Sequence, residues 1–395
     1  MLKSISITFI INLVVFAVQG REIPVKTWYD ADKKLLKESY TVIRDKNDSL
    51  IKQGNYIIYY RDGTIWQQGK FENNELSGLW KDYYEDGTLK QEMPYQKSKL
   101  NGVLMYYYPS GKLQQKLTYR DDLLNGTALN YFENGVLQES SNYLNNLLDG
   151  ETKAYYEDGI LRFIKTFKAG IEDGNYVAYF ENGKIKERST KKEGVYDGLF
   201  RDYYKDYADG TINKICNYSH AMLNGKLNAF YPSGNIRIEC NYENDRIIGV
   251  YKEYYDSSTV ILREVGQYFQ NTKTGIWKSF YMTGAIYSTG AFKAGKLEGE
   301  WKVYYQNGKL KQAGLYADGK ASGEWTIYYD TGELKNKGSY VNDYKSGVWK
   351  TYYTTGELMS EITFKDGQRD GVAKAYTKDG KLVETINYKN GEKTE

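Results

Sequence analysis

Histidine and cysteine are nearly absent from this chain. Its 395 residues include one histidine, His220, and two cysteines, Cys216 and Cys240. A zinc site needs a cluster of such residues, and a Ser-His-Asp arrangement would have to be built on His220, which lies in a polar stretch expected to form a turn. No phosphate-loop signature occurs in the sequence. We therefore expect a protein that is not an enzyme and that uses no metal and no cofactor.

Proline is also rare, and no stretch concentrates basic charge. The chain has 4 Pro against 42 Tyr, 39 Gly and 7 Trp, and its formal net charge is +3. Aromatic residues with frequent glycine are typical of short strands joined by tight turns. Proteins that bind nucleic acid usually carry a concentrated basic face, whereas acidic and basic residues are interspersed here. The composition predicts an all-β protein that does not bind nucleic acid.

Residues 1–20 have the pattern of a secretory signal peptide. Lys3 supplies the charged start, a mostly apolar stretch runs from Ile5 to Val18, and Ala17 and Gly20 offer cleavage points. The apolar stretch is short for a membrane span, and an uncleaved anchor is the alternative. We expect the protein to be exported to the periplasm or the cell surface, or to be secreted.

A period of 24 residues organises the rest of the chain. Glycines recur at positions 54, 78, 102, 126, 150, 174, 198, 225, 249, 275, 299, 323, 347 and 371, with two longer steps of 27 and 26 residues. With each of these glycines as offset zero, offsets five and six are an aromatic pair in every repeat except the last, which has Tyr376-Thr377. Offsets eight and nine are Asp, Asn, Ser or Thr followed by Gly, except in the two repeats with longer first turns. Offset eleven is Leu or Ile, and offset seventeen is nearly always Tyr or Phe. Residues 54–395 therefore form about fourteen tandem units, and residues 21–53 are expected to be a degenerate half-repeat that caps the sheet edge.

These positions predict one β-hairpin in each unit. Asp-Gly or Asn-Gly between two β-prone runs favours a type I′ turn, which would pair offset six with eleven, two with fifteen and zero with seventeen. Trp277, Trp301 and Trp325 at offset two would then each face a glycine, and a large residue opposite a small one is what cross-strand packing predicts. The aromatic at offset seventeen is expected to cover the glycine at offset zero. The predicted fold is an elongated single-layer antiparallel meander of about 14 hairpins.

This register also predicts which side chains share a face. Offsets two, six, eleven and seventeen should lie on one face, with the offset-five tyrosine and the recurring Lys or Arg of offset three on the other. Cys216 and Cys240 occupy the same offset in adjacent hairpins, about 10 Å apart, which is too far for a disulfide. We expect free thiols that face Phe200 and Leu227, whereas a solenoid with one strand per coil would allow the bond.

The repeated unit resembles a known family. Its segments Gly323 to Leu334 and Tyr340 to Gly347 are similar to the MORN-repeat variant of bacterial proteins labelled YwqK-family antitoxins, and the resemblance covers about residues 54–395. It implies a β-hairpin array that binds a cognate toxin, or proteins and membrane lipids as in MORN proteins generally. Such repeats carry no catalytic residues, and the export signal departs from the cytoplasmic location of an antitoxin.

The candidate binding surface is an aromatic ladder at offsets two and six. Its members are Trp277, Trp301, Trp325, Trp349, Tyr281, Tyr305, Tyr329 and Tyr353. These rings either only cover the sheet, or they bind an extended ligand, because a large exposed apolar patch usually marks an interaction surface. Tyrosine and tryptophan suit such contacts because they combine a large apolar area with a polar tip.

We therefore predict a non-enzymatic binding or scaffold protein that acts outside the cytoplasm and binds a protein or other extended partner. The alternatives are an antitoxin that neutralises a toxin partner, and adhesion to glycan or membrane lipid. Two units have longer first turns, at residues 205–210 and 256–259. These turns are either neutral insertions at loop tips or loops that set specificity.

Overall fold

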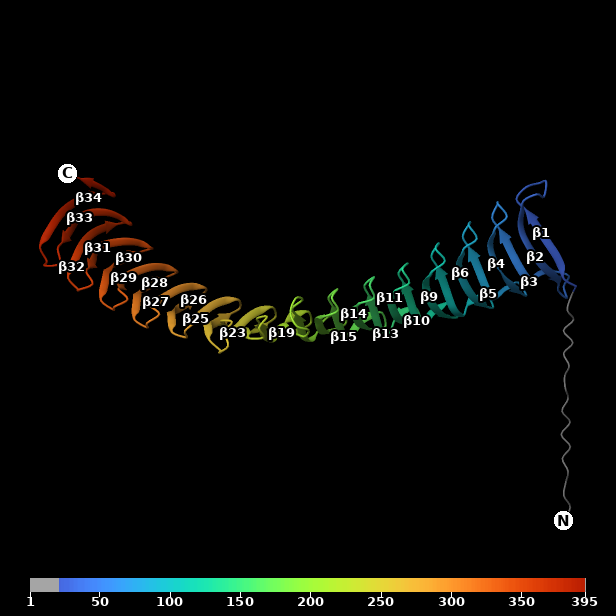
Figure 1. Ribbon diagram of the computed structural model, residues 1–395, viewed down its shortest axis with the longest axis horizontal. Coiled ribbons are helices and arrows are strands. Elements are labelled where there is room, and N and C mark those ends of the chain that lie inside the picture. The colour runs from blue at the N-terminus through green and yellow to red at the C-terminus, as the bar shows by residue number, and fades with distance from the viewer. Residues whose placement is uncertain (1–20, 395) are drawn as a thin grey trace, which may run out of the picture. The chain divides into compact units, whose positions relative to one another are not determined.

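A computed structural model describes residues 21–394, so the predicted signal peptide lies outside the described residues. The elements of the described part are all β-strands joined by turns (Figure 1). Residues 21–394 contain no helix long and apolar enough to cross a membrane. The chain divides into two compact units: the first extends to Leu161 and includes Phe167–Gly170, and the second contains Arg162–Thr166 and everything from Ile171 onward.

The first unit contains thirteen complete strands and part of a fourteenth. They are β1 (Ile23–Trp28), β2 (Leu36–Arg44), β3 (Leu50–Tyr59), β4 (Ile65–Glu72), β5 (Glu75–Tyr83), β6 (Leu89–Gln96), β7 (Lys99–Leu100), β8 (Gly102–Tyr107), β9 (Leu113–Arg120), β10 (Leu123–Tyr131), β11 (Leu137–Leu144), β12 (Leu147–Leu148), β13 (Gly150–Tyr155) and β14 (Leu161–Lys168). The segment 21–53, expected to be a cap, forms β1, β2 and the start of β3, and the described pairing of β1 is with β2.

The second unit contains the remaining strands. They are β15 (Ile171–Tyr179), β16 (Ile185–Lys192), β17 (Val195–Tyr196), β18 (Gly198–Tyr203), β19 (Ile212–Ser219), β20 (Met222–Leu223), β21 (Gly225–Phe230), β22 (Ile236–Glu243), β23 (Arg246–Tyr254), β24 (Leu262–Phe269), β25 (Thr272–Phe280), β26 (Ile286–Lys293), β27 (Lys296–Tyr304), β28 (Leu310–Ala317), β29 (Lys320–Tyr328), β30 (Leu334–Val341), β31 (Tyr344–Tyr352), β32 (Leu358–Lys365), β33 (Gln368–Tyr376), β34 (Leu382–Lys389) and β35 (Glu392–Thr394).

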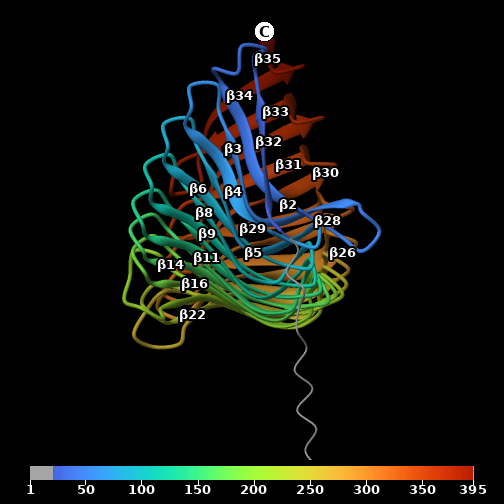
Figure 2. The same cartoon turned by 90° about the vertical axis from the view of Figure 1, so that its right-hand side faces the viewer.

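Each unit is an open antiparallel meander, which confirms the predicted fold class. In the second unit, for example, β25 pairs with β26, β26 with β27 and β27 with β28. Some of the longer strands are interrupted just before the repeat glycine, and their first two residues are counted as separate strands: β7, β12, β17 and β20. For example, β7 and β8 both pair with β6. The longer strands are bent rather than flat (Figure 2).

The predicted register is confirmed in the middle of each hairpin and wrong next to its turn. Trp277 pairs with Gly290 and Gly275 with Phe292, so offset two meets fifteen and offset zero meets seventeen. Offset eleven, however, pairs with five instead of six, as in Phe280 with Ile286, because the register shifts by one residue between Ser279 and Phe280. Paired residues point to the same face, so the Leu or Ile of offset eleven lies on the opposite face from tryptophan. The predicted face is therefore corrected to offsets two, six and seventeen.

The first turn of the hairpin is not type I′. The Gly284 N–H donates to the carbonyl of Tyr281 at 2.9 Å, and Gly284 has φ +84° while Thr283 keeps a negative φ. A type I′ turn needs positive φ at both central residues, whereas a type I turn followed by a left-handed glycine needs it only at the glycine. The prediction was wrong because Asp-Gly and Asn-Gly suit both turns.

The type I′ geometry occurs instead in the turn that joins one hairpin to the next. Glu72 pairs with Glu75, and the two residues between them, Asn73 and Asn74, have φ of 52° and 67°. The second residue of this turn also binds the preceding hairpin: the Asn74 N–H donates to the carbonyl of Lys52 at 3.0 Å, and its Oδ1 accepts from the Lys52 N–H at 2.6 Å. These two bonds link neighbouring repeats along one edge of the sheet.

The glycine at offset zero is needed for its backbone conformation and not for an aromatic cover. Gly299 has φ +77°, and a Cβ added there would have nothing within 4 Å. The predicted covering by the aromatic of offset seventeen is therefore wrong. At this glycine the register between β26 and β27 shifts: Gly290 pairs with Trp301 but Ala291 pairs with Glu298, which leaves Gly299 and Glu300 as extra residues. The extra residues form a bulge, and bulges bend strands.

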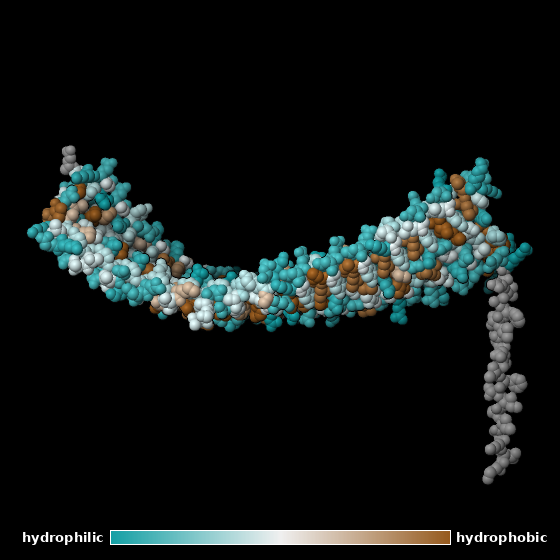
Figure 3. All heavy atoms as spheres, viewed as in Figure 1, coloured by the Kyte–Doolittle hydropathy of each residue, from teal (hydrophilic) through white to brown (hydrophobic). Residues whose placement is uncertain are grey.

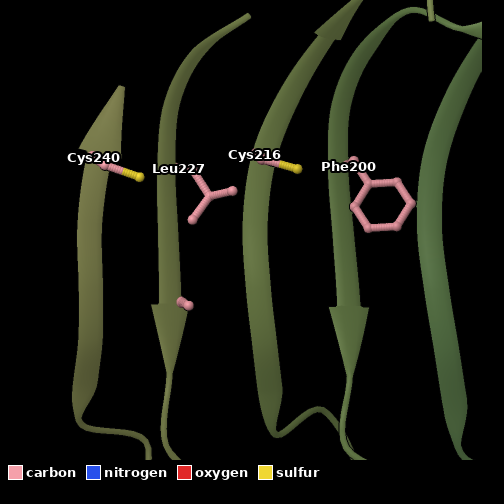
Figure 4. Packing of buried hydrophobic residues seen from close by; sticks show 5 residues of the cluster. Phe200, Cys216, Leu227 and Cys240 are labelled. Carbon is pink, nitrogen blue, oxygen red and sulfur yellow. The ribbon is translucent and has the colours of Figure 1, made fainter. Parts of the chain in front are cut away.

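The two cysteines are free thiols, as the meander predicted. Cys216 pairs with Phe200 and Cys240 pairs with Leu227 on neighbouring hairpins. Figure 4 shows Leu227 between the two sulfur atoms, within a buried cluster that also includes Ala229. Burial raises the pKa of each thiol to about 11, so both stay protonated at neutral pH and serve as small apolar residues.

Candidate functional site

The tryptophans of the predicted ladder are packed into the sheet surface instead of standing free on it. The exposed fraction is 2% for Trp277 and 5% for Trp325 and Trp349, and Trp301 is half-buried. A flat single-layer sheet would leave such rings exposed, so neighbouring side chains must cover them. These four residues, with the tyrosines of offset six, lie on what we call the tryptophan face.

Each indole ring covers a glycine of the preceding repeat. A Cβ added at Gly290 would lie 2.1 Å from Cε3 of Trp301, and one added at Gly314 would lie 2.0 Å from Cδ2 of Trp325. The sequence correctly predicted that tryptophan and glycine pair within one hairpin, but the ring leans over the glycine on its other side. The tryptophan–glycine contact thus joins two repeats.

The indole N–H groups add hydrogen bonds between the same two repeats. Nε1 of Trp325 donates to the carbonyl of Leu315 at 3.2 Å, and Nε1 of Trp349 donates to the carbonyl of Ser339 at 3.0 Å. Both carbonyls lie in the strand that precedes the tryptophan. A buried tryptophan N–H needs such a partner, so these rings have their polar atom already occupied.

Aromatic rings of offsets two and seventeen alternate along the second unit and pack edge to face. The ring centroids of Tyr316 and Trp325 are 5.3 Å apart, those of Trp325 and Tyr340 are 5.7 Å apart, and those of Tyr340 and Trp349 are 5.0 Å apart. Edge-to-face contacts of this kind stabilise by about 0.5–1.5 kcal/mol each beyond the area they bury. The geometry gives the tryptophan ladder a structural role, while partner binding by these residues stays a prediction.

The tyrosines of offset six connect one repeat to the next through their hydroxyl groups. Each hydroxyl donates to the carbonyl of offset five in the following repeat. The donor and acceptor pairs of the predicted site are Tyr281 to Tyr304, Tyr305 to Tyr328, Tyr329 to Tyr352 and Tyr353 to Tyr376, at 2.8–2.9 Å. Burial raises the pKa of Tyr281, which keeps this hydroxyl a donor. The rings remain half-buried.

A basic side chain at offset twelve lies over many of these tyrosine rings, and sequence reasoning missed it. Nζ of Lys311 is 5.6 Å from the ring centroid of Tyr305, and Nζ of Lys335 is 5.2 Å from that of Tyr329. The same step occurs between Lys90 and Tyr84 in the first unit, at 5.7 Å. The signal was available as a Lys or Arg that recurs six residues after the aromatic. Six repeats carry a basic residue there: Lys90, Arg162, Lys186, Arg237, Lys311 and Lys335. Arg263 takes the equivalent place in a seventh repeat, whose first turn is two residues longer, because it follows Leu262, which pairs with Tyr254.

The opposite face carries the lysines of offset three and the tyrosines of offset five, as predicted. Nζ of Lys81 lies 2.8 Å from Oε1 of Glu92. The hydroxyl of Tyr107 donates to Oε2 of the same carboxylate at 3.0 Å. The arrangement recurs where Tyr254 donates to Glu239 at 2.7 Å. The carboxylates of Glu92 and Glu239 are therefore held in local hydrogen-bond networks on this face.

Glu92 makes the stability of the first unit depend on pH. The hydrogen bond from Lys81, together with that from Tyr107, lowers the pKa of the Glu92 carboxyl below its ordinary value of 4.5. The folded state therefore favours the carboxylate, so Glu92 contributes stability above pH 4.5 that is lost as the pH falls through the lowered pKa. We expect Glu92→Gln to destabilise β5–β8 at pH 7 and to have little effect at pH 3, measured by urea unfolding at both values. Glu85→Gln, on an exposed turn, is the control and should show no such difference.

The described residues contain no group of three His, Cys, Asp or Glu side chains placed to hold a metal ion. His220 lies in the expected turn, with φ 49°. Its backbone N–H donates to Oδ2 of Asp197 at 3.1 Å, and its side chain is 83% exposed. His220 is therefore a solvent-exposed residue of a turn.

One of the two long turns is tied to the turn before it. Oδ1 of Asp256 accepts hydrogen bonds from Oγ of Ser233 at 2.6 Å and from Nδ2 of Asn235 at 2.9 Å, whereas Val260, at the end of the same loop, is 80% exposed. In the other long turn the rings of Tyr204 and Tyr207 pack at 5.4 Å. Both loops thus have a defined conformation on the first-turn edge of the sheet.

The fold and this surface define a tandem β-hairpin repeat protein whose side chains recur every 24 residues. The chain belongs to the MORN repeat variant family. The family model matches eleven segments: residues 52–73, 76–97, 100–121, 124–145, 148–169, 172–190, 223–244, 297–318, 321–342, 345–366 and 369–390. Tandem MORN repeats indicate a repeat-based binding or scaffold role.

Comparison with solved structures gives distant likenesses. The chain is similar to one in the crystal structure of TcdB2-TccC3-Cdc42, with 11% identity over 93% of this chain and 26% of that one and a TM-score of 0.16. It is also similar to a chain of TcdB2-TccC3, with 12% identity over 93% of this chain and 23% of that one and a TM-score of 0.15. The chain thus spans about a quarter of those chains. A search of curated proteins finds no match to this sequence.

Proposed function

We propose that this protein is a non-enzymatic binding protein that acts outside the cytoplasm and holds an extended protein partner along its tryptophan face. The observation that carries the proposal is the repeated step of a basic side chain over a tyrosine ring, as in Lys311 over Tyr305 and Lys335 over Tyr329. Identical steps in successive repeats suit a partner that is itself extended, since each step adds one weak contact and the contacts act together.

The exposed atoms of each lysine–tyrosine pair indicate which side chains the partner should carry. The tyrosine hydroxyl is already bonded to the next repeat, so the groups that remain for a ligand are the ring edge and the basic head. Lys311 and Lys335 are exposed, and charge complementarity favours acidic side chains opposite them. We therefore propose a protein segment that carries Asp or Glu at intervals, bound outside the cytoplasm after cleavage of residues 1–20.

Site-specific cross-linking tests this proposal with matched control positions on the opposite face of the same unit. A photo-reactive amino acid replaces Lys311 or Lys335 on the tryptophan face and, in control variants, Lys278 or Lys350 on the opposite face; all four lysines are exposed. Cells that make the full chain are irradiated, and adducts are identified by mass spectrometry. We expect one acidic partner protein to be captured from both positions 311 and 335, less at high salt, and not from 278 or 350.

Equal capture from the two faces, or capture only from positions 278 and 350, would contradict the proposed surface. Adducts that form before export, on chain still carrying residues 1–20, would contradict the proposed location.

A further inference from the structure

A hollow of about 430 Å³ in the second unit departs from the repeated pattern of the tryptophan face. Its lining includes Glu253, Tyr255, Arg263, Glu264, Tyr281 and Tyr287. Its volume lies in the range of small-ligand sites. The long turn at residues 256–259 begins directly after Tyr255, so the hollow lies beside one of the two places where the period of the chain is broken.

The aromatic wall of this hollow exists because one repeat exchanges a basic residue for a tyrosine. The residue after the Leu or Ile of the second strand is Arg263 in the preceding repeat, where the longer turn shifts the count, and Lys311 in the following one, but it is Tyr287 here. The rings of Tyr281 and Tyr287 meet edge to face at 5.2 Å, and Tyr287 is 43% exposed. Where the two neighbouring repeats present a cation, this one presents an open aromatic surface.

The charged groups around the hollow neutralise one another. Nη1 of Arg263 donates to Oε1 of Glu253 at 2.9 Å, and Nζ of Lys273 donates to Oε1 of Glu264 at 2.9 Å. Both bonds use Oε1, so Oε2 of each carboxylate can accept a hydrogen bond from a ligand hydroxyl. The site thus offers hydrogen-bonding groups next to an aromatic ring without a net charge to attract an ion.

We propose that this hollow binds one neutral sugar unit of an oligosaccharide. A pyranose ring has an apolar face of C–H groups that packs on an aromatic ring, and a rim of hydroxyls that donate to carboxylates and accept from a guanidinium. Tyr287 supplies the ring, Glu253 and Glu264 the acceptors, and Arg263 a donor. The proposal is independent of the protein partner inferred above, because it uses a repeat in which Tyr287 replaces the basic residue.

Binding of neutral oligosaccharides to the full chain tests the proposal. The probes are soluble hexamers built of β-linked glucose, N-acetylglucosamine, mannose or xylose and of α-linked glucose, titrated by calorimetry. We expect at least one to bind, and Tyr287→Ala to weaken it at least tenfold. Tyr287→Lys, which restores the residue type of the neighbouring repeats, should have the same effect. Tyr344→Ala removes another exposed tyrosine of this unit, 59% exposed, and should leave affinity unchanged.

The proposal is overturned if none of the five hexamers binds, or if Tyr287→Ala binds as the wild type does. It is also overturned if Tyr344→Ala weakens binding as much as Tyr287→Ala, since the contact would then not lie in this hollow. Circular dichroism and tyrosine fluorescence of each variant establish that the fold is retained. Loss of the cross-linked protein partner described above would leave these outcomes unaffected.

Discussion

Replacing Trp325 by alanine is expected to destabilise strands β28–β30 by about 3–5 kcal/mol, the usual cost of deleting a buried tryptophan. The ring is 5% exposed, packs edge to face on Tyr316 and Tyr340, and donates its N–H to Leu315. The contacts with Tyr316 and Leu315 cross to the preceding repeat, whereas Tyr340 belongs to the same repeat as Trp325. Repeat proteins owe much of their stability to interfaces between repeats, so the loss should appear in the preceding repeat as well as in the substituted one.

Amide hydrogen exchange in the native state measures this effect strand by strand, which avoids assuming that a long repeat array unfolds in one step. Trp66→Ala is the matched control, because Trp66 is 46% exposed, and it should cost less than about 1 kcal/mol. If the two tryptophans cost the same, the structural role assigned to the buried ladder is wrong. Partner binding by this ladder can only be judged in variants that keep these strands folded.

Adding one methyl group at Gly314 is expected to destabilise the same strands by about 1–3 kcal/mol, as overpacking does in a filled core. Its backbone is not in the left-handed region, so alanine is conformationally acceptable there, but the new Cβ would lie 2.0 Å from Cδ2 of Trp325. The ring would have to move out of its contacts with the preceding repeat. The measurement is again hydrogen exchange of β28–β30.

A double-mutant cycle separates this clash from any general cost of alanine at position 314. In the Trp325→Ala background the methyl group has no ring to meet, so Gly314→Ala should then cost much less than it does in the wild type. Equal costs in the two backgrounds would show that the ring does not lie over this glycine.

Much of the fold was predictable because its determinants lie within one 24-residue unit. The pairing of Trp277 with Gly290 followed from the alternation of large and small residues, and the free thiols of Cys216 and Cys240 followed from the spacing of strands in a meander. The predicted type of the first turn was wrong because Asp-Gly is compatible with two turn types. The one-residue register shift next to this turn places offset eleven on the other face.

The candidate site was less predictable because burial depends on neighbouring repeats. The expectation of an exposed aromatic patch assumed a single-layer sheet with nothing to cover the rings. The strands bend (Figure 2), and rings of neighbouring repeats pack against one another, as Tyr340 does against Trp349. On the face of the first unit that Figure 3 shows, apolar side chains appear as separate stripes between polar ones. The basic residues of offset twelve were visible in the sequence, but only their distance to the tyrosine rings indicates a role.

The sequence by itself determined the all-β class, the hairpin as the repeating unit and the residues that face one another within it, since turn residues and strand alternation act over a few positions. Which glycine each tryptophan covers, which carbonyl each tyrosine hydroxyl reaches and where the hollow beside Tyr287 opens were decided by the tertiary structure. Those features arise between hairpins, where bulges shift the register. No pattern inside a single unit specifies the position of the next hairpin relative to it.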